Sequence, residues 1–128
     1  MSKPVKTRNN NEWTEARYRS FVKSALRSAS QRWPPKYQVL NEAYVGQQIN
    51  KSSGRMAKHF RCNKCLDLFP QKEVEVNHLT PVVLTSGFDS WDGVIERLFC
   101  EKDKLEVLCK PCHKLVTKEE NQERKTNE

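Results

Sequence analysis

The sequence predicts a small α+β fold in which helices and short strands share one thin core. Apolar residues recur at helical spacing over residues 18–29 and 91–99. They alternate with charged residues over residues 74–76 and 105–108, which is the pattern of a strand. Only 36% of the 128 residues are hydrophobic, so a core of this size needs additional support.

Two Cys-x-x-Cys pairs are candidates for that support. Cys62 and Cys65 form the first pair, and Cys109 and Cys112 form the second. Four thiolates at this spacing suit a closed tetrahedral zinc site that holds a fold together. A plain zinc ribbon with incidental surface histidines is the simpler interpretation. The fifth cysteine, Cys100, lies in an apolar stretch and is expected to be a small buried hydrophobe.

Charge is segregated along the chain. Residues 1–61 hold 13 Lys and Arg against 3 Asp and Glu, whereas residues 62–128 hold 10 against 13. A basic half predicts a polyanionic partner, with nucleic acid as the first candidate. Solubility alone would explain the net charge but not its segregation. The cations expected to contact DNA are Arg17, Lys23, Arg27, Arg32, Lys36, Arg55 and Lys58.

The first half is expected to be mainly helical. Residues 1–12 read as a disordered basic tail, and residues 13–58 read as a basic helical extension. A helix follows an N-cap at Thr14 or Asn11 and stops at Pro34-Pro35, because proline lacks the amide proton. A shorter helix is expected over residues 37–44, followed by a polar loop over residues 46–54.

The second half alternates strands and helices around the cysteines. Strands are expected at residues 59–61, 74–77 and 105–108. A loop containing Pro81 leads to a helix from Trp91, capped by Asp89 or Ser90. A last helix opens at Cys112 or His113, and residues 121–128 read as a charged tail. The chain has no apolar run long enough to span a bilayer and begins without a signal-peptide core, so a soluble intracellular protein is expected.

Two histidines lie outside the thiolate set. His78 follows a strand end, where an imidazole can act as a general base near neutral pH; a hydrogen bond to the loop backbone is the simpler role. His113 follows Cys112 at a helix start and is well placed to bind a second, catalytic metal. Asn77 offers an oxygen of the kind that hard cations such as Mg²⁺ prefer.

These residues resemble the HNH endonuclease family, in its small zinc-binding bacteriophage form. The resemblance is close over residues 62–120 and includes Leu108-Cys109-Lys110-Pro111-Cys112-His113. It implies a ββα-metal (HNH) module over residues 59–120, in which a two-stranded hairpin and a helix surround one divalent ion. The implied activity is metal-dependent nicking or cleavage of DNA phosphodiester bonds.

The resemblance also implies roles and partners. His78 matches the general base, while Asn77 and His113 match the ligands of Mg²⁺ or another divalent ion such as Mn²⁺. The four cysteines match the ligands of a structural Zn²⁺. The protein would be phage-encoded and act on DNA in the cytoplasm of an infected bacterial host. Phage packaging or replication proteins are further candidate partners, and a membrane is not.

Three positions depart from the family pattern. Asn77 stands where most members have an aspartate, and Lys104 stands where an asparagine braces the loop of the general base. Val116 stands where a lysine often follows the helix histidine. These departures favour an alternative function, that of a weak or inactive HNH-fold DNA-binding module or accessory protein in a phage DNA-processing machine. A zinc-ribbon adaptor for a packaging terminase is a third hypothesis.

Overall fold

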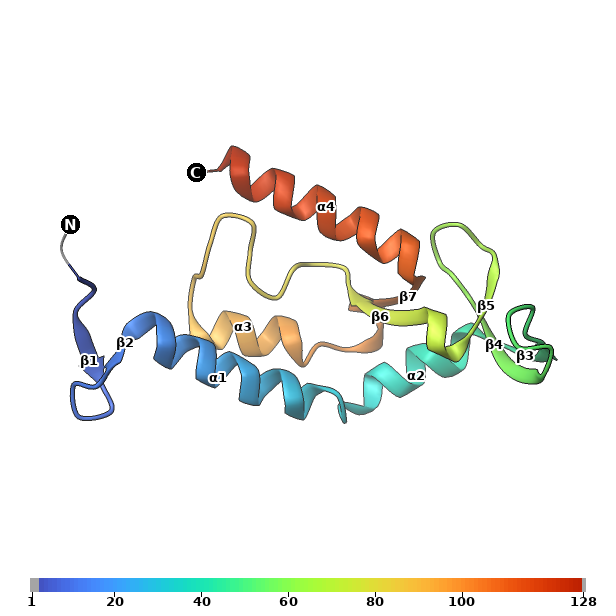
Figure 1. Ribbon diagram of the computed structural model, residues 1–128, viewed down its shortest axis with the longest axis horizontal. Helices are drawn as coiled ribbons and strands as arrows, with labels where there is room; N and C mark the ends of the chain where they lie inside the picture. Colours follow the sequence, from blue (N-terminus) through green and yellow to red (C-terminus); the bar gives the residue numbers. More distant parts are fainter. Residues whose placement is uncertain (1–2, 128) are drawn as a thin grey trace. The chain divides into compact units, whose positions relative to one another are not determined.

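The computed structural model describes residues 3–127 and divides the chain into two compact units, Met1–Arg32 and Trp33–Glu128 (Figure 1). Residues 33–58, which belong to the expected basic extension, are part of the second of these units. The reason is that Val39, Leu40 and Ala43 pack against the buried Phe60, Val74 and Val107, which ties this segment to the second unit.

The first unit is a short hairpin followed by one helix. Its turn, Asn9-Asn10-Asn11, has φ of 53°, 55° and 64°, a left-handed conformation that asparagine tolerates. Residues 6–12 therefore form a strand and a turn rather than part of the expected disordered tail, while residues 1–2 of that prediction lie outside the described residues. The Thr14 side chain accepts a hydrogen bond from the Arg17 amide at 3.1 Å, so Thr14 is the N-cap. The elements are β1 (Lys6–Arg8), β2 (Trp13–Thr14) and α1 (Glu15–Ser30).

The second unit begins with a helix and a three-stranded antiparallel sheet of order β3-β4-β5. Pro34 and Pro35 occupy the first turn of α2, where the missing amide protons cost nothing. The expected loop at residues 46–54 is wrong for its first half, because residues 44–49 pair with β4 and only Asn50–Gly54 forms a turn. The elements are α2 (Pro34–Ala43), β3 (Tyr44–Ile49), β4 (Met56–Arg61) and β5 (Leu68–Pro70).

The remaining chain forms a two-stranded antiparallel sheet flanked by helices. Figure 1 shows β6 and β7 side by side, with α4 leaving directly from the end of β7. The expected strands and the helix from Trp91 are confirmed, and Ser90 is the cap because its Oγ accepts from the Gly93 amide at 3.0 Å. The elements are η1 (Gln71–Glu73), β6 (Val74–His78), α3 (Trp91–Leu98), η2 (Lys102–Lys104), β7 (Leu105–Cys109) and α4 (Lys110–Thr126).

Helix α4 is longer than the sequence suggested. It starts at Lys110 rather than at Cys112 or His113, and it continues to Thr126 through most of the expected charged tail. Glu123 accepts a hydrogen bond from Thr85, and Arg124 donates to the Val83 carbonyl, so the last turns are held by contacts outside the helix. Within residues 3–127, no helix combines the length and apolar character needed to cross a membrane.

The core of the second unit lies on both sides of the β6–β7 pair. Val74 and Val107 pack with Phe60 and the apolar side chains of α2. Leu108 packs with three of the cysteines, and Phe69 and Val116 cover that cluster. The departure at Val116 thus has a structural use, because this side chain of α4 packs against the core.

Candidate functional site

The four cysteines converge where the turn after β4 meets the junction of β7 and α4. Their sulfur atoms all lie within 4.8 Å of one another, and Cys65 Sγ is 3.9 Å from Cys109 Sγ. A disulfide would require about 2 Å, whereas the edge of a tetrahedron around zinc is about 3.8 Å for Zn–S bonds of about 2.3 Å. The cluster could therefore hold a metal ion such as zinc.

The backbone around Cys62 is arranged to stabilise a thiolate. Burial opposes ionisation of the Cys62 thiol, but the backbone groups of Cys109, Cys65 and Lys64 donate to its sulfur and lower its pKa to about 6. The Lys64 amide lies 3.4 Å from this sulfur. Leu66 closes the turn in a left-handed conformation, with φ of 66°. The Cys62–Cys65 turn thus presents one sulfur that is stabilised as a thiolate and suited to bind a cation.

Other thiols of the cluster favour the protonated form. Hydrogen bonding to Cys109, together with burial, raises the pKa of the Cys112 thiol to about 12. The pKa of Cys65 is raised as well. Four crowded thiols cannot all ionise without a compensating cation, so a metal ion at this point would release protons on binding.

His113 forms a pair with a carboxylate that the sequence analysis did not select. Its Nδ1 lies 2.9 Å from Glu75 Oε2, which joins α4 to β6, and both side chains are partly exposed. A carboxylate that accepts the Nδ1 proton fixes the ring and directs Nε2 outward, as it does for histidines that bind metals. The signal in the sequence was the spacing of Glu75 and Asn77, which places both on one face of a strand.

Asn77 contacts a second carboxylate. It is directly opposite Glu106 on β7, and its Nδ2 donates to Glu106 Oε1 at 3.3 Å. Asn63 donates to the other oxygen of Glu106 at 3.0 Å. Among the described residues, no hydrogen bond joins Asn77 to His113. The structure therefore gives each predicted ligand its own carboxylate partner rather than a contact with the other.

His78 is held at the end of β6 by α3. Its Nε2 lies 3.1 Å from the Leu98 carbonyl oxygen. The next residue, Leu79, donates its amide to the Lys104 carbonyl at 2.9 Å. Lys104 therefore contacts the start of the loop through its main chain, at the position where the resemblance expects an asparagine. The structure places His78 against α3, whereas Glu75 faces α4.

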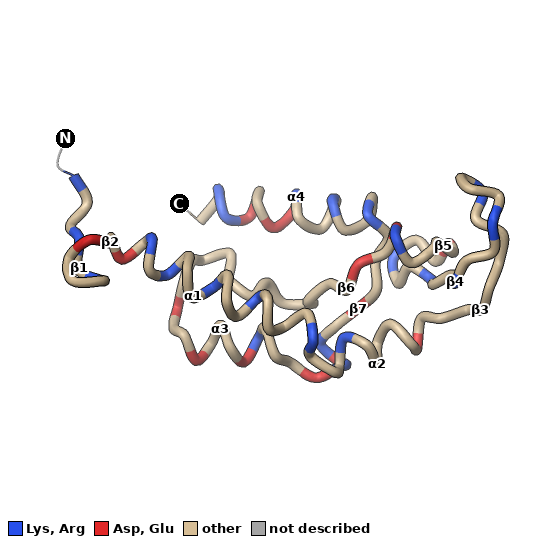
Figure 2. Tube along the Cα trace, turned by 60° about the horizontal axis from the view of Figure 1, so that its bottom comes forward, with Lys and Arg blue, Asp and Glu red and all other residues tan. Residues whose placement is uncertain are grey.

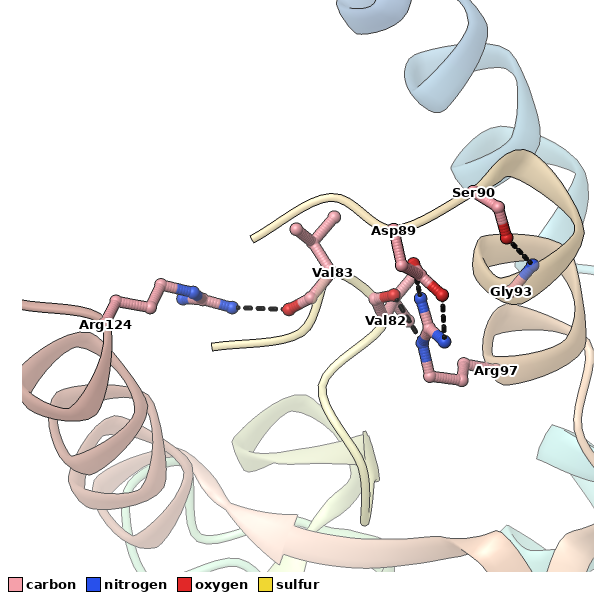
Figure 3. Close-up of polar contacts among 7 residues, drawn as sticks. All are labelled: Val82, Val83, Asp89, Ser90, Gly93, Arg97 and Arg124. Atoms are coloured by element: carbon pink, nitrogen blue, oxygen red, sulfur yellow. Dashed lines mark hydrogen bonds and ion pairs between the residues drawn. The ribbon is translucent and has the colours of Figure 1, made fainter. Parts of the chain in front are cut away.

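The loop between β6 and α3 is anchored by two arginines that the sequence analysis also missed. Figure 3 shows Arg97 of α3 and Arg124 of α4 pointing toward this loop. Arg97 donates to the Val82 carbonyl at 2.8 Å and forms two hydrogen bonds to the Asp89 carboxylate, whose pKa falls to about 2 mainly through that interaction. Arg124 donates to the Val83 carbonyl at 2.9 Å. Both ends of the loop are thus fixed.

Gly93 leaves room for the Asp89–Arg97 pair. A Cβ at this position would lie 2.2 Å from Asp89 Oδ2 and 2.9 Å from Arg97 Nη1. Gly93→Ala, which normally stabilises a helix by about 1 kcal/mol, is expected to displace the pair and lose this gain. In an Asp89→Ala background the nearer obstacle is gone and the Arg97 side chain is released to move aside, so the same change should raise the melting temperature. An equal effect in both backgrounds, measured by thermal unfolding, would show that the pair is not constrained by Gly93.

The cations expected to contact DNA are divided between the two units. Arg17 lies over the Trp13 ring at 4.4 Å in the first unit. Lys36 is half-buried on α2, and burial lowers its pKa. Arg55 and Lys58 line one hollow beside the β3–β4 hairpin. In the first unit, α1 carries Arg17, Lys23 and Arg27, and Arg32 ends the unit.

Comparison with known proteins identifies no relative. No protein-family model matches the chain, no curated protein matches it, and no solved structure matches it.

Proposed function

We propose that the protein is a metal-dependent HNH endonuclease that nicks or cleaves DNA, on a scaffold held by a structural zinc ion. The observation that carries this proposal is the order β6-β7-α4, with His113 in the first turn of α4 and its imidazole against β6. A strand pair followed by a helix is the order of the ββα-metal module. The cysteine cluster lies at the joint between β7 and α4, so zinc there would set the position of His113.

The donor set fits a hard divalent ion beside the zinc site. Asn77 and His113 would hold the ion, and Glu75 and Glu106 supply the negative charge that Asn77 lacks. Mg²⁺ or Mn²⁺ in this place would stabilise the charge that develops on phosphate oxygens. Glu75 has the supporting role, because its carboxylate orients the His113 ring.

His78 is the proposed general base. In this role the imidazole takes a proton from the water that attacks phosphorus. The hydrogen bond to the Leu98 carbonyl fixes the ring, and the arginine-anchored loop follows directly in the chain. The role requires a ring that stays in one orientation, and these contacts supply it.

The expected result is conversion of supercoiled plasmid to open circles when Mg²⁺ or Mn²⁺ is added to the zinc-loaded protein. Hydrolysis that releases the 3′ oxygen leaves 5′-phosphate and 3′-hydroxyl ends, which DNA ligase reseals. The matched control omits the divalent ion while zinc stays bound. Absence of conversion with every divalent ion tested would contradict the proposed activity.

A second function, that of an HNH-fold DNA-binding module or phage accessory protein without cleavage, is favoured by the partners of the site residues. The Asn77 amide is engaged by Glu106, and His78 is engaged by Leu98. This alternative predicts salt-sensitive DNA binding with no cleavage. Either function would operate in the cytoplasm of an infected bacterial host, and phage packaging or replication proteins are the candidate partners.

Asn77→Asp separates the two functions. It places a carboxylate against Glu106 where the amide now donates a hydrogen bond, so the variant should melt at a lower temperature without a divalent ion. Added Mg²⁺ should restore the melting temperature and raise the nicking rate if this is the catalytic metal site. Asn63→Asp, which meets the other oxygen of Glu106, is the matched control and should gain no activity. Restored stability without any nicking would favour the binding module.

A further inference from the structure

The β3–β4 hairpin has charge of one sign only. Residues 44–61 contain Lys51, Arg55, Lys58 and Arg61, and they contain no Asp or Glu. Figure 2 shows blue Lys and Arg segments on the β3–β4 hairpin, including its turn. Helix α4 of the same unit, by contrast, mixes cations with Glu119, as well as with other acidic residues. The hairpin therefore presents an unbalanced positive surface.

A hollow beside the hairpin collects three of the cations of this region. It encloses about 640 Å³ and is lined by Arg55 and Lys58 from the hairpin and by Lys72 from η1. Asn50, Ser53 and Gln71 add polar side chains, and none of its described lining residues carries a carboxylate. A hollow of about 550 Å³ on the same sheet includes the carboxylates Asp67 and Glu73 in its lining, beside Lys51 and Ile49 of the hairpin. The first hollow is thus suited to an anion.

One face of the hairpin also exposes apolar side chains. Ile49 and Met56 are directly opposite each other and are 64% and 59% exposed. Two positions further along the ribbon, the pair of Gln47 and Lys58 shares this face and is exposed as well. Directly opposite residues of an antiparallel pair point to the same side of a sheet. Cationic, amide and apolar groups therefore lie together on one accessible strip.

We propose that this basic hairpin, defined as residues 44–61 together with Lys72, docks on duplex DNA. Arg55, Lys58 and Lys72 bind backbone phosphates in the hollow, while Ile49 and Met56 contact sugars and base edges. The choice of DNA as the polyanion rests on the proposed function. It is supported by shape, because the major groove of DNA admits a two-stranded β-ribbon. It is also supported by charge, since each cation faces no competing carboxylate in the hollow.

The hairpin leads directly into the cysteine cluster, so DNA bound to it is held next to that cluster in the chain. Strand β4 ends at Arg61, and the next residue is Cys62 of the cysteine cluster. A duplex bound by the hairpin is therefore held by the same segment that leads into Cys62 and Cys65. Phosphate contacts fix register and orientation without reading sequence, and contacts to base edges add preference.

Salt dependence gives a quantitative test. Each phosphate neutralised by a cation contributes about 0.9 to the slope of log K against log salt. The triple variant Arg55→Gln, Lys58→Gln, Lys72→Gln is therefore expected to lower the slope by about 2.7, with at least tenfold weaker binding of a short duplex. The measurement is fluorescence anisotropy of a labelled duplex with zinc-loaded full-length protein. Lys114→Gln, Lys118→Gln, Lys125→Gln on α4 removes the same charge and is the matched control.

The apolar contacts of Ile49 and Met56 are tested separately, by their effect on affinity and on the salt slope. Ile49→Thr with Met56→Thr keeps strand propensity and is expected to weaken binding without changing the salt slope. Leu115→Gln, at an exposed apolar position of α4, should leave binding unchanged. A triple variant that keeps the wild-type slope and affinity would overturn the proposal, as would wild-type protein that does not bind DNA. If the protein binds DNA through the hairpin but does not nick it, the proposed nuclease activity is wrong and the docking surface stands. If the hairpin variants nick DNA as the wild type does, the docking surface is wrong and the nuclease activity stands.

Discussion

Cys62→Ser is expected to unfold residues 33–128. The Cys62 side chain is fully buried beside Leu108 and Cys109, and backbone groups stabilise its sulfur as a thiolate. Structural zinc contributes about 10–16 kcal/mol to the folding of small metal-binding domains, which matches or exceeds the whole stability of a typical domain, about 5–15 kcal/mol. The measurement is near-UV circular dichroism and thermal unfolding, with zinc content determined by mass spectrometry.

The control for this experiment is the fifth cysteine. Cys100 lies outside the cluster and is only partly buried. Cys100→Ser should keep one zinc per chain and unfold cooperatively at a slightly lower temperature. The metal requirement is contradicted if wild-type protein stripped by a chelator keeps its full near-UV signal and melting temperature, because the fold would then need no metal.

His113→Ala is expected to abolish binding of the second divalent ion and, with it, the nicking of DNA. His113 is the imidazole ligand in the proposed site, and the zinc cluster is unaffected because the four sulfur atoms remain. Glu75→Gln should have a weaker effect of about 10–100-fold on metal affinity, because it acts through the orientation of the ring. The readout besides activity is the electron paramagnetic resonance of Mn²⁺ titrated into zinc-loaded protein.

A neighbouring carboxylate tests whether this effect is local. Glu73 precedes β6 and has no ion pair among the described residues, so Glu73→Gln should bind Mn²⁺ as the wild type does. If His113→Ala binds Mn²⁺ with unchanged affinity, the second metal does not lie where the account places it.

The parts of the fold that were predicted correctly depend on local signals. The alternation around Val76 and Val107, the cap at Ser90 and the two cysteine pairs are each readable within a few residues. Strand β3 has no such signal, because Gln47 and Gln48 are polar and exposed on an edge strand. Its pairing with β4 is set by the turn at Asn50–Gly54 and by contacts along the whole hairpin.

The polar contacts of the site depend on register, which local patterns do not specify. Glu106 meets Asn77 because the β6–β7 pairing places them directly opposite each other. Glu75 meets His113 because α4 packs on β6, a contact between segments almost forty residues apart. The sequence therefore selected Asn77 and His113 as candidate ligands, but not the carboxylates that contact them.

If His78 is the base of a metal-dependent nuclease, its loss slows the chemical step, which is measured by single-turnover nicking with zinc-loaded wild type and His78→Ala in Mn²⁺. When the two proteins contain equal zinc and bind the duplex equally well, a difference in nicking rate reflects the chemical step. The nicking rate is expected to saturate with Mn²⁺ in the wild type and to fall by about 10²–10⁴-fold in the variant. Equal rates in the two proteins, or no nicking by either, would contradict this role of His78.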